Sequence, residues 1–181
     1  CSAQVHVQGA RQHQLGVLLV GHHGFLHQVL RQLGEDFAHQ QRCALVRAAI
    51  ELREADAHAA ACRSRGRHAD AVGWQEHALA LASEAHGAPS VAVGQRAEEL
   101  CLAYNALAMR LVEGEDFERA LALLRKAEVL AEGELAVPLA ASRARLQGVT
   151  FNNLGCFYKR YERPRSALRY LRCALDVERD F

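Results

Sequence analysis

Clustered histidines are the residues of this 181-residue sequence with a spacing suited to metal chemistry. His23 and His27, next to His22, are four residues apart, which would place two imidazoles on one face of a helix. No Cys, Asp or Glu lies at a local spacing that would complete a set of four ligands, and Gly24 weakens a helix at this point. We therefore expect no metal site.

Six cysteines, which could form disulfides or act as nucleophiles, occur singly and without a C-x-x-C pair. Secreted disulfide scaffolds are shorter and richer in cysteine, so we expect reduced thiols in a cytoplasmic protein. Cys43 and Cys62 fall on an apolar helix face, and with Cys156 they are interpreted as small buried hydrophobic residues. The cysteines are Cys1, Cys43, Cys62, Cys101, Cys156 and Cys173.

Paired acids are the remaining candidates for catalysis. Glu98-Glu99 and Glu115-Asp116 fall at exposed or helix-capping positions, where nothing would shift a carboxyl pKa for acid–base work. The sequence contains no G-x-G-x-x-G, G-x-x-x-x-G-K-[ST] or G-x-S-x-G string. We expect no catalytic residues, no cofactor and no enzymatic activity.

The composition is that of a globular helical protein. Half of the residues are hydrophobic and 24% are charged, and Ala, Leu, Arg and Glu dominate, which favours helix. The net charge of +1 gives no global attraction to nucleic acid or to membranes, and we expect neither as a partner. The apolar run at residues 15–20 is too short to span a bilayer, and no signal peptide is expected.

One order of residue types recurs along the chain. The two clearest copies comprise Tyr104, Leu107, Ala108, Leu111, Ala120, Leu124 and Ala127, and then Phe151, Leu154, Gly155, Tyr158, Ala167, Leu171 and Ala174. A weaker copy comprises Ala55, His58, Ala59, Cys62, Ala71, Gln75 and Ala78. The alanines at 71, 120 and 167 are 49 and 47 residues apart, so the sequence predicts a repeated unit.

Each unit is predicted to be two antiparallel helices, because its apolar residues follow the i, i+3, i+4, i+7 spacing. Asp116 is a candidate N-cap of a second helix, and Pro164 a candidate first helical residue. Long first helices are predicted from Pro89 to Val112 and from Pro138 to Arg160. The predicted units cover residues 41–86, 89–134 and 138–181.

The leading segment, residues 1–40, lacks this pattern. Gly16, Gly21 and Gly24 are expected to interrupt any helix, although residues 25–33 could form one. We expect this segment to be only partly helical, with a long helix from about residue 40 to residue 63 opening the first unit.

The repeated motif resembles the tetratricopeptide signature, most closely over residues 151–171. The long first helices and the Asn-Asn-Leu-Gly string are similar to the extended repeats of kinesin light chains. The first unit departs from the pattern at His58 and Gln75, where large apolar residues are usual. The resemblance implies an all-α, right-handed solenoid of antiparallel helix pairs, and a scaffold that binds other proteins.

In tetratricopeptide proteins the first helices line a concave groove for a partner peptide or helix. Asn105 and Asn152 occupy equivalent places in successive units, and an amide side chain can hydrogen-bond a peptide backbone. By this resemblance Asn105, Met109, Asn152, Cys156 and Lys159 are the predicted partner-binding residues; an ordinary solvated face is the alternative.

A basic run near the end of the chain is a possible surface for an acidic partner. It comprises Arg160, Arg163, Arg165, Arg169 and Arg172, beside Lys159. The alternative is a solvated edge of a helix pair. A clamp for a terminal carboxylate is not expected, because the matching face at residues 56–60 is not basic.

A structural role in a larger cytoskeletal, ciliary or transport complex is the competing function. The final helix, residues 165–181, carries Leu168, Leu171, Leu175 and Phe181 with no following helix to cover them, so docking or self-association there is expected. Trp74 is expected between stacked units, with an anchor for a partner as the alternative.

Overall fold

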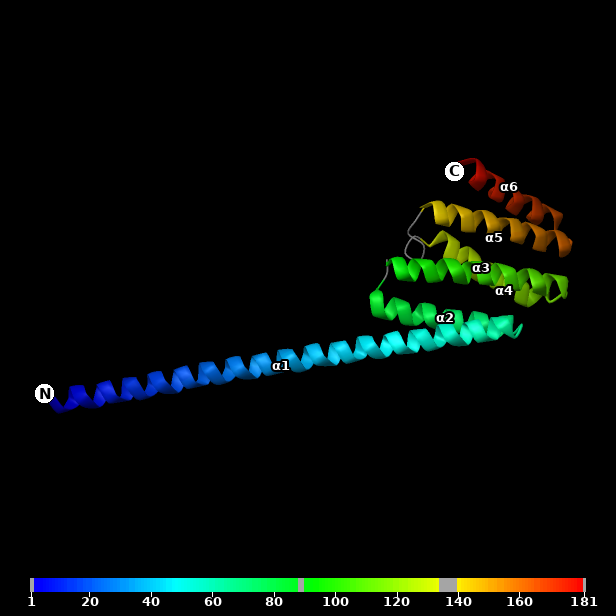
Figure 1. Cartoon of the computed structure of the whole chain (residues 1–181). Helices are drawn as coiled ribbons and strands as arrows, with labels where there is room; N and C mark the ends of the chain where they lie inside the picture. The colour runs from blue at the N-terminus through cyan, green and yellow to red at the C-terminus, as the bar shows by residue number, and fades with distance from the viewer. Residues whose placement is uncertain (1, 88–89, 134–139, 181) are drawn as a thin grey trace. The chain divides into compact units, whose positions relative to one another are not determined.

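The computed structural model describes residues 2–87, 90–133 and 140–180, and it describes side chains from residue 31 onward and at Gln28. These residues form six helices and contain no strand, which confirms the predicted all-α fold (Figure 1). The chain divides into two compact units, Cys1–Arg47 and Ala48–Phe181. The helices are α1 (Ser2–Ser64), α2 (His68–His86), α3 (Val91–Glu113), α4 (Phe117–Glu132), α5 (Ala140–Arg160) and α6 (Pro164–Asp180).

The leading segment differs from the sequence prediction. Helix α1 runs without a break from Ser2 to Ser64, through the glycines that were expected to interrupt it. A glycine costs a helix only about 1 kcal/mol relative to alanine and keeps its backbone N–H, whereas a proline would remove that donor. Residues 2–64 contain no proline, so the helix is weakened but not stopped.

The helix termini follow local sequence signals. Asp116 caps α4, since its carboxylate accepts a hydrogen bond from the backbone N–H of Arg119 at 3.2 Å. Ser90 caps α3 in the same way through Val93, and Pro164 is the first residue of α6, as predicted. Pro89 and Pro138, which were predicted to open the long first helices, lie outside the described residues.

The turn between the two helices has the same geometry in each pair. Its central residue is left-handed at the same repeat position, with φ of 72° at Gly66, 63° at Glu115 and 56° at Glu162. The next backbone N–H donates to a carbonyl oxygen five residues earlier at 2.9 Å, and the pairs are Arg67 to Cys62, Asp116 to Leu111 and Arg163 to Tyr158. These turns keep the 49- and 47-residue spacing of the sequence repeat.

The core lies where successive pairs stack. Figure 1 shows α3 between α2 and α5, and α3 packs against α2, α4 and α5. Ala71, Ala120 and Ala167 are buried at the same place in their second helices, as the repeat predicted. Small residues are needed for close packing: a Cβ at Gly155 would lie 2.7 Å from Cδ2 of Leu171.

Candidate functional site

Two junctions join the three helix pairs of residues 48–180. We call the contact of residues 48–86 with α3 and α4 the first junction, and the contact of α3 and α4 with α5 and α6 the second junction. One repeat position on the first helices is informative at both. It is occupied by Asp56, Asn105 and Asn152 in turn.

The second junction buries Asn105, which is only 2% exposed. Its Nδ2 donates to Oγ1 of Thr150 on α5 and to the carbonyl oxygen of Cys101, both at 2.9 Å. Its Oδ1 accepts a hydrogen bond from Nδ2 of Asn153 at 2.9 Å. The next first helix therefore covers this face and takes up the amide of Asn105, and binding of a partner peptide by Asn105 stays an untested prediction.

The other predicted groove residues do not gather into one site with Asn105. Met109 is half-buried on α3. Asn152, Cys156 and Lys159 are exposed on α5, on the face that corresponds to the covered face of α3. Asn152 differs from Asn105 in exposure because no described helix follows α5 and α6 to cover it.

An aromatic cluster closes the other side of the second junction. Arg125 of α4 donates to the hydroxyl oxygens of Tyr170 at 2.6 Å and Tyr158 at 3.2 Å. The rings of Tyr158 and Tyr170 are stacked with centroids 5.5 Å apart. Burial lowers the pKa of Arg125, but its hydrogen bonds to Glu128 and Tyr170 outweigh burial and raise the pKa overall. Arg125 is thus a structural cation.

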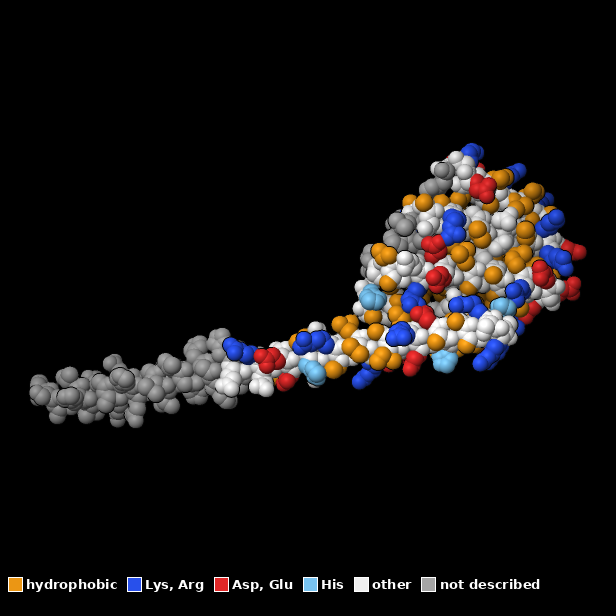
Figure 2. Space-filling view, viewed as in Figure 1, with side chains coloured by type: hydrophobic (Ala, Val, Ile, Leu, Met, Phe, Trp, Pro, Cys, Tyr) orange, Lys and Arg blue, Asp and Glu red, His pale blue; other side chains and the backbone are white. Residues whose placement is uncertain are grey.

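The predicted basic run is exposed but spread over several elements. Arg160 ends α5, Arg163 lies in the turn, and the other three lie on α6. Arg169 lies over the Tyr170 ring, 5.0 Å from its centroid. On the face seen in Figure 2, basic and acidic side chains are interspersed among hydrophobic ones. Binding of an acidic partner by the whole run remains a prediction.

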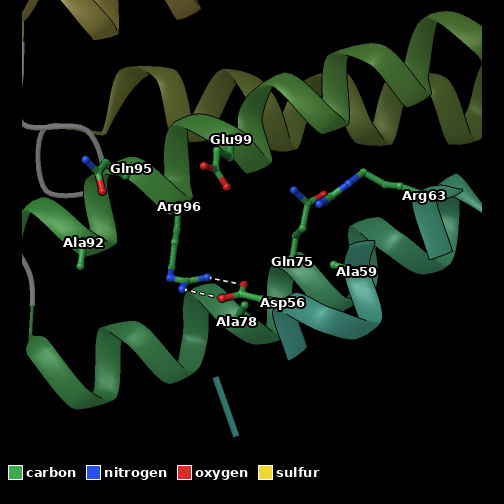
Figure 3. A pocket seen from close by; sticks show the side chains of 9 residues that line it. All are labelled: Asp56, Ala59, Arg63, Gln75, Ala78, Ala92, Gln95, Arg96 and Glu99. Carbon is green, nitrogen blue, oxygen red and sulfur yellow. Dashed lines mark hydrogen bonds and ion pairs between the residues drawn. The ribbon is translucent and has the colours of Figure 1, made fainter. Parts of the chain in front are cut away.

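The first junction contains a polar cavity of about 320 Å³ between α1, α2 and α3 (Figure 3). Asp56 and Arg96 form a two-pronged ion pair at its edge, with N–O distances of 2.6 and 2.9 Å. This hydrogen-bonded pairing raises the pKa of Arg96. The cavity is lined by Asp56, Ala59, Arg63, Gln75, Ala78, Ala92, Gln95, Arg96 and Glu99.

Several polar groups of the cavity remain available to a ligand. Arg63 forms no ion pair with any described residue, and in Figure 3 its side chain and that of Gln75 point toward one another. Gln95 and Glu99 approach from α3 and are exposed. The cavity therefore offers a guanidinium, two amides and a carboxylate around an alanine-lined wall.

Sequence reasoning did not find this cavity, although one signal pointed to it. Gln75 was noted as a departure from the repeat pattern, where a large apolar residue is usual. In the structure Gln75 lines the cavity, so the missing apolar side chain leaves space there. A polar residue at this repeat position was thus the signal that could have indicated a cavity.

On its opposite side the first junction is tied by a three-residue network. The Tyr104 hydroxyl donates to Oε1 of Glu76 at 2.6 Å, and Nζ of Lys126 donates to the same oxygen at 2.7 Å. Burial and the bond to Glu76 raise the pKa of Tyr104. Burial raises the pKa of Glu76, but its two hydrogen bonds outweigh burial and lower the pKa overall. An apolar cleft of about 550 Å³ lies beside this network.

Paired antiparallel helices with one shared turn geometry define a helical-repeat array. Residues 59–91 match the family model of the tetratricopeptide repeat. The match covers the end of α1, all of α2 and the start of α3, and it supports a tetratricopeptide repeat in this part of the chain. No curated protein and no solved structure gave a significant match.

The matched repeat is the one whose motif is weakest by inspection, and it contributes Ala59, Arg63, Gln75 and Ala78 to the cavity. The similarity to kinesin light chains is not addressed by this match and remains a prediction. Within the described residues, every helix is either too short or too polar to cross a lipid bilayer.

Proposed function

We propose that this chain is a protein-binding scaffold and that the cavity of the first junction holds a segment of the partner. Tetratricopeptide repeats are a protein-interaction fold, and the match at residues 59–91 supports that general role. The observation that carries the proposal is the unpaired Arg63 beside a polar cavity, in a junction whose counterpart is filled by side chains. Catalysis has no part in it.

The chemistry of the cavity favours an extended acidic segment. The guanidinium of Arg63 would pair with a carboxylate of the partner, because Arg donors match carboxylate geometry. The amides of Gln75 and Gln95 can both donate to and accept from a peptide backbone. A volume of about 320 Å³ accommodates one or two side chains, which fits a short segment better than a whole domain.

An array of immobilised short peptides of random sequence, probed with the full chain, tests this proposal. We expect enrichment of peptides that contain Asp or Glu, and loss of their binding on Arg63→Glu. Arg65→Glu makes the same charge change two residues away, in a turn outside the cavity lining, and should keep the binding. Equal binding by wild type and Arg63→Glu would remove the cavity as the site.

The finer assignment follows the resemblance. We propose an extended-repeat scaffold of the type found in kinesin light chains, acting in the cytoplasm. A peptide or helix of a second protein is the expected partner, with no cofactor. Neither nucleic acid nor a membrane has a place in the proposal, because the net charge of +1 gives the chain no global attraction to either.

A second candidate function is a structural role in the assembly of a larger complex, cytoskeletal, ciliary or for transport. Leu168 and Leu175 on α6 favour it, because they are 57% and 64% exposed. They lie seven residues apart on one face of the helix, where a contiguous apolar surface usually marks an interface. Phe181, which was predicted to extend this face, lies outside the described residues.

A further inference from the structure

The side chain types that hold the second junction recur on the last described helix pair, α5 and α6. From α3 and α4, Asn105 bonds α5, Leu121 packs with the core of α5 and α6, and Arg125 bonds Tyr170. The same residue types stand 47 residues later, at Asn152, Leu168 and Arg172.

These three residues are exposed on α5 and α6, and Asn152 and Arg172 make no hydrogen bond or ion pair with any described residue. We call Asn152, Leu168 and Arg172 the tail face. It has the composition of a stacking surface, and nothing described is stacked on it. A helix pair that stacks on this face needs residues equivalent to those with which α5 and α6 contact α3 and α4 at the second junction.

The opposite end of the array presents such a surface. At the second junction Leu146, Thr150 and Phe157 of α5 and Tyr170 of α6 receive α3 and α4. Two repeats earlier, the equivalent positions are Ile50, Glu54, Ala61 and Trp74. We call these four residues the head face. Ile50 is 52% exposed, Trp74 is 36% exposed, and Glu54 is exposed.

We infer that the tail face of one copy of this chain stacks on the head face of another. In the register of the second junction, the Asn152 amide donates to the Glu54 carboxylate, as Asn105 donates to Thr150. The Arg172 guanidinium lies over the Trp74 ring, as Arg125 lies over Tyr170 at 5.6 Å from its centroid. Leu168 packs against Ala61.

The charges favour head-to-tail pairing over pairing of like ends. The tail end carries Lys159, Arg165 and Arg172, so two tails would bring guanidinium groups together. Residues 50–54 of the head end carry Glu51 and Glu54 against the one base Arg53, so this stretch is net acidic and complements that charge. A head-to-tail contact leaves a free end on each side, and the copies therefore form open chains whose length rises with concentration.

The register also explains why Trp74 is exposed. The sequence predicted Trp74 between stacked units, but among the described residues its ring stacks on His58, with centroids 4.5 Å apart, and lies edge-on to His77. Stacking between copies places the ring between units. The inference rests on the assembly role proposed above, and it names the partner as a second copy.

Two blocked variants of the full chain test the pairing. Leu168→Glu blocks the tail, and Ile50→Glu with Trp74→Phe blocks the head. All three residues are exposed, and a thermal midpoint matching wild type checks that each variant folds. In sedimentation velocity we expect wild type to form species that grow with concentration, each variant alone to be a monomer, and their equimolar mixture to stop at a dimer.

Tryptophan fluorescence gives an independent readout, because Trp74 is the only tryptophan of the sequence. In the mixture only the Leu168→Glu chain fluoresces through Trp74, so pairing should shift its emission to shorter wavelength. Adding Arg172→Ala to the head-blocked chain removes the guanidinium that is assigned to the Trp74 ring, and should weaken the pairing and reduce this shift; an unchanged shift would contradict the assigned contact.

A wild type that stays monomeric at its highest soluble concentration would overturn the inference, as would a mixture that fails to dimerise or self-association that survives Leu168→Glu. The proposed assembly role is tested separately, by fractionation of native extract. It is contradicted only if the wild type is monomeric and also does not enter a larger complex through a contact that Leu168→Glu abolishes.

Discussion

The two junctions of this array are built from the same repeat, but buried side chains fill the second junction and the first contains a polar cavity. At the second junction, Asn105 meets Thr150 and Asn153 and is buried. At the first junction, Ala103 and Ala106 stand at the repeat positions of Thr150 and Asn153, and their side chains cannot form a hydrogen bond with the equivalent Asp56. Asp56 pairs with Arg96 instead and remains partly exposed.

The difference between the junctions follows from the free-energy cost of burying each side chain. A neutral amide can be buried once its donors and acceptor are satisfied, whereas a carboxylate is costly to bury even when it is paired. The bulky Phe157 fills the second junction, and the exposed Arg110 stands at its position in the first. In this repeat array, incomplete stacking therefore accompanies the cavity at the first junction.

Truncation of a stacking leucine should give the largest contrast between the junctions. Leu154→Ala removes a fully buried side chain from the second junction and should lower the free energy of unfolding by about 3 kcal/mol. Leu107→Ala, at the same repeat position, removes a half-buried side chain and should cost about half as much. Urea unfolding measures both, and equal losses would show that the junctions are equally packed.

Loss of the hydrogen-bonding side chain should be the next largest effect. Asn105→Ala leaves Thr150 and Asn153 without their partner in a buried place, at a cost of about 2 kcal/mol. Asp56→Ala breaks an ion pair that is partly exposed, and should cost less than about 1 kcal/mol. A costlier Asp56→Ala in the same unfolding assay would reverse the proposed difference.

The close approach of α5 and α6 can be tested at two glycines of α5. Gly155→Ala forces the new methyl group against Leu171 and should destabilise by about 1–2 kcal/mol. Gly148→Ala meets only Cγ1 of Val177, at 4.0 Å, and should be neutral or should stabilise by up to about 1 kcal/mol. Thermal unfolding distinguishes them, and two equal effects would contradict the close approach of α6 at Gly155.

Alkaline pH should destabilise the first junction, because it ionises the Tyr104 hydroxyl. Burial and the bond to Glu76 raise its pKa above the ordinary 10.0, so the neutral phenol is favoured in the folded state. Its contribution is complete below pH 10 and is lost as the pH rises further, because the unfolded chain then ionises first. The thermal midpoint should fall above pH 10, less steeply in Tyr104→Phe; identical slopes would contradict this role.

Much of the fold could be predicted from the sequence because its signals are local. The spacing of apolar residues, the Asp116 cap and the anchor alanines each depend on neighbours within a helix or a turn. The continuous α1 was missed because glycines were given too much weight as helix breakers. Helix α1 shows that several glycines spread along a run do not end a helix.

The binding residues could not be predicted in the same way, because burial of a helix face depends on the neighbouring repeat. Asn105 and Asn152 look equivalent in the sequence, yet α5 covers the first and nothing described covers the second. The cavity brings Asp56 and Arg63 of α1 together with residues 92–99 of α3. That pairing of positions follows only from the register between helices.

Hydrogen exchange of the full chain, with and without the strongest acidic peptide from the array, shows whether the first junction binds that peptide. We expect the peptide to slow amide exchange around residues 56–63 and 92–99, which contribute to the cavity lining, and to leave exchange at residues 148–160 of α5 unchanged. Protection confined to residues 148–160, with none at the first junction, would contradict it.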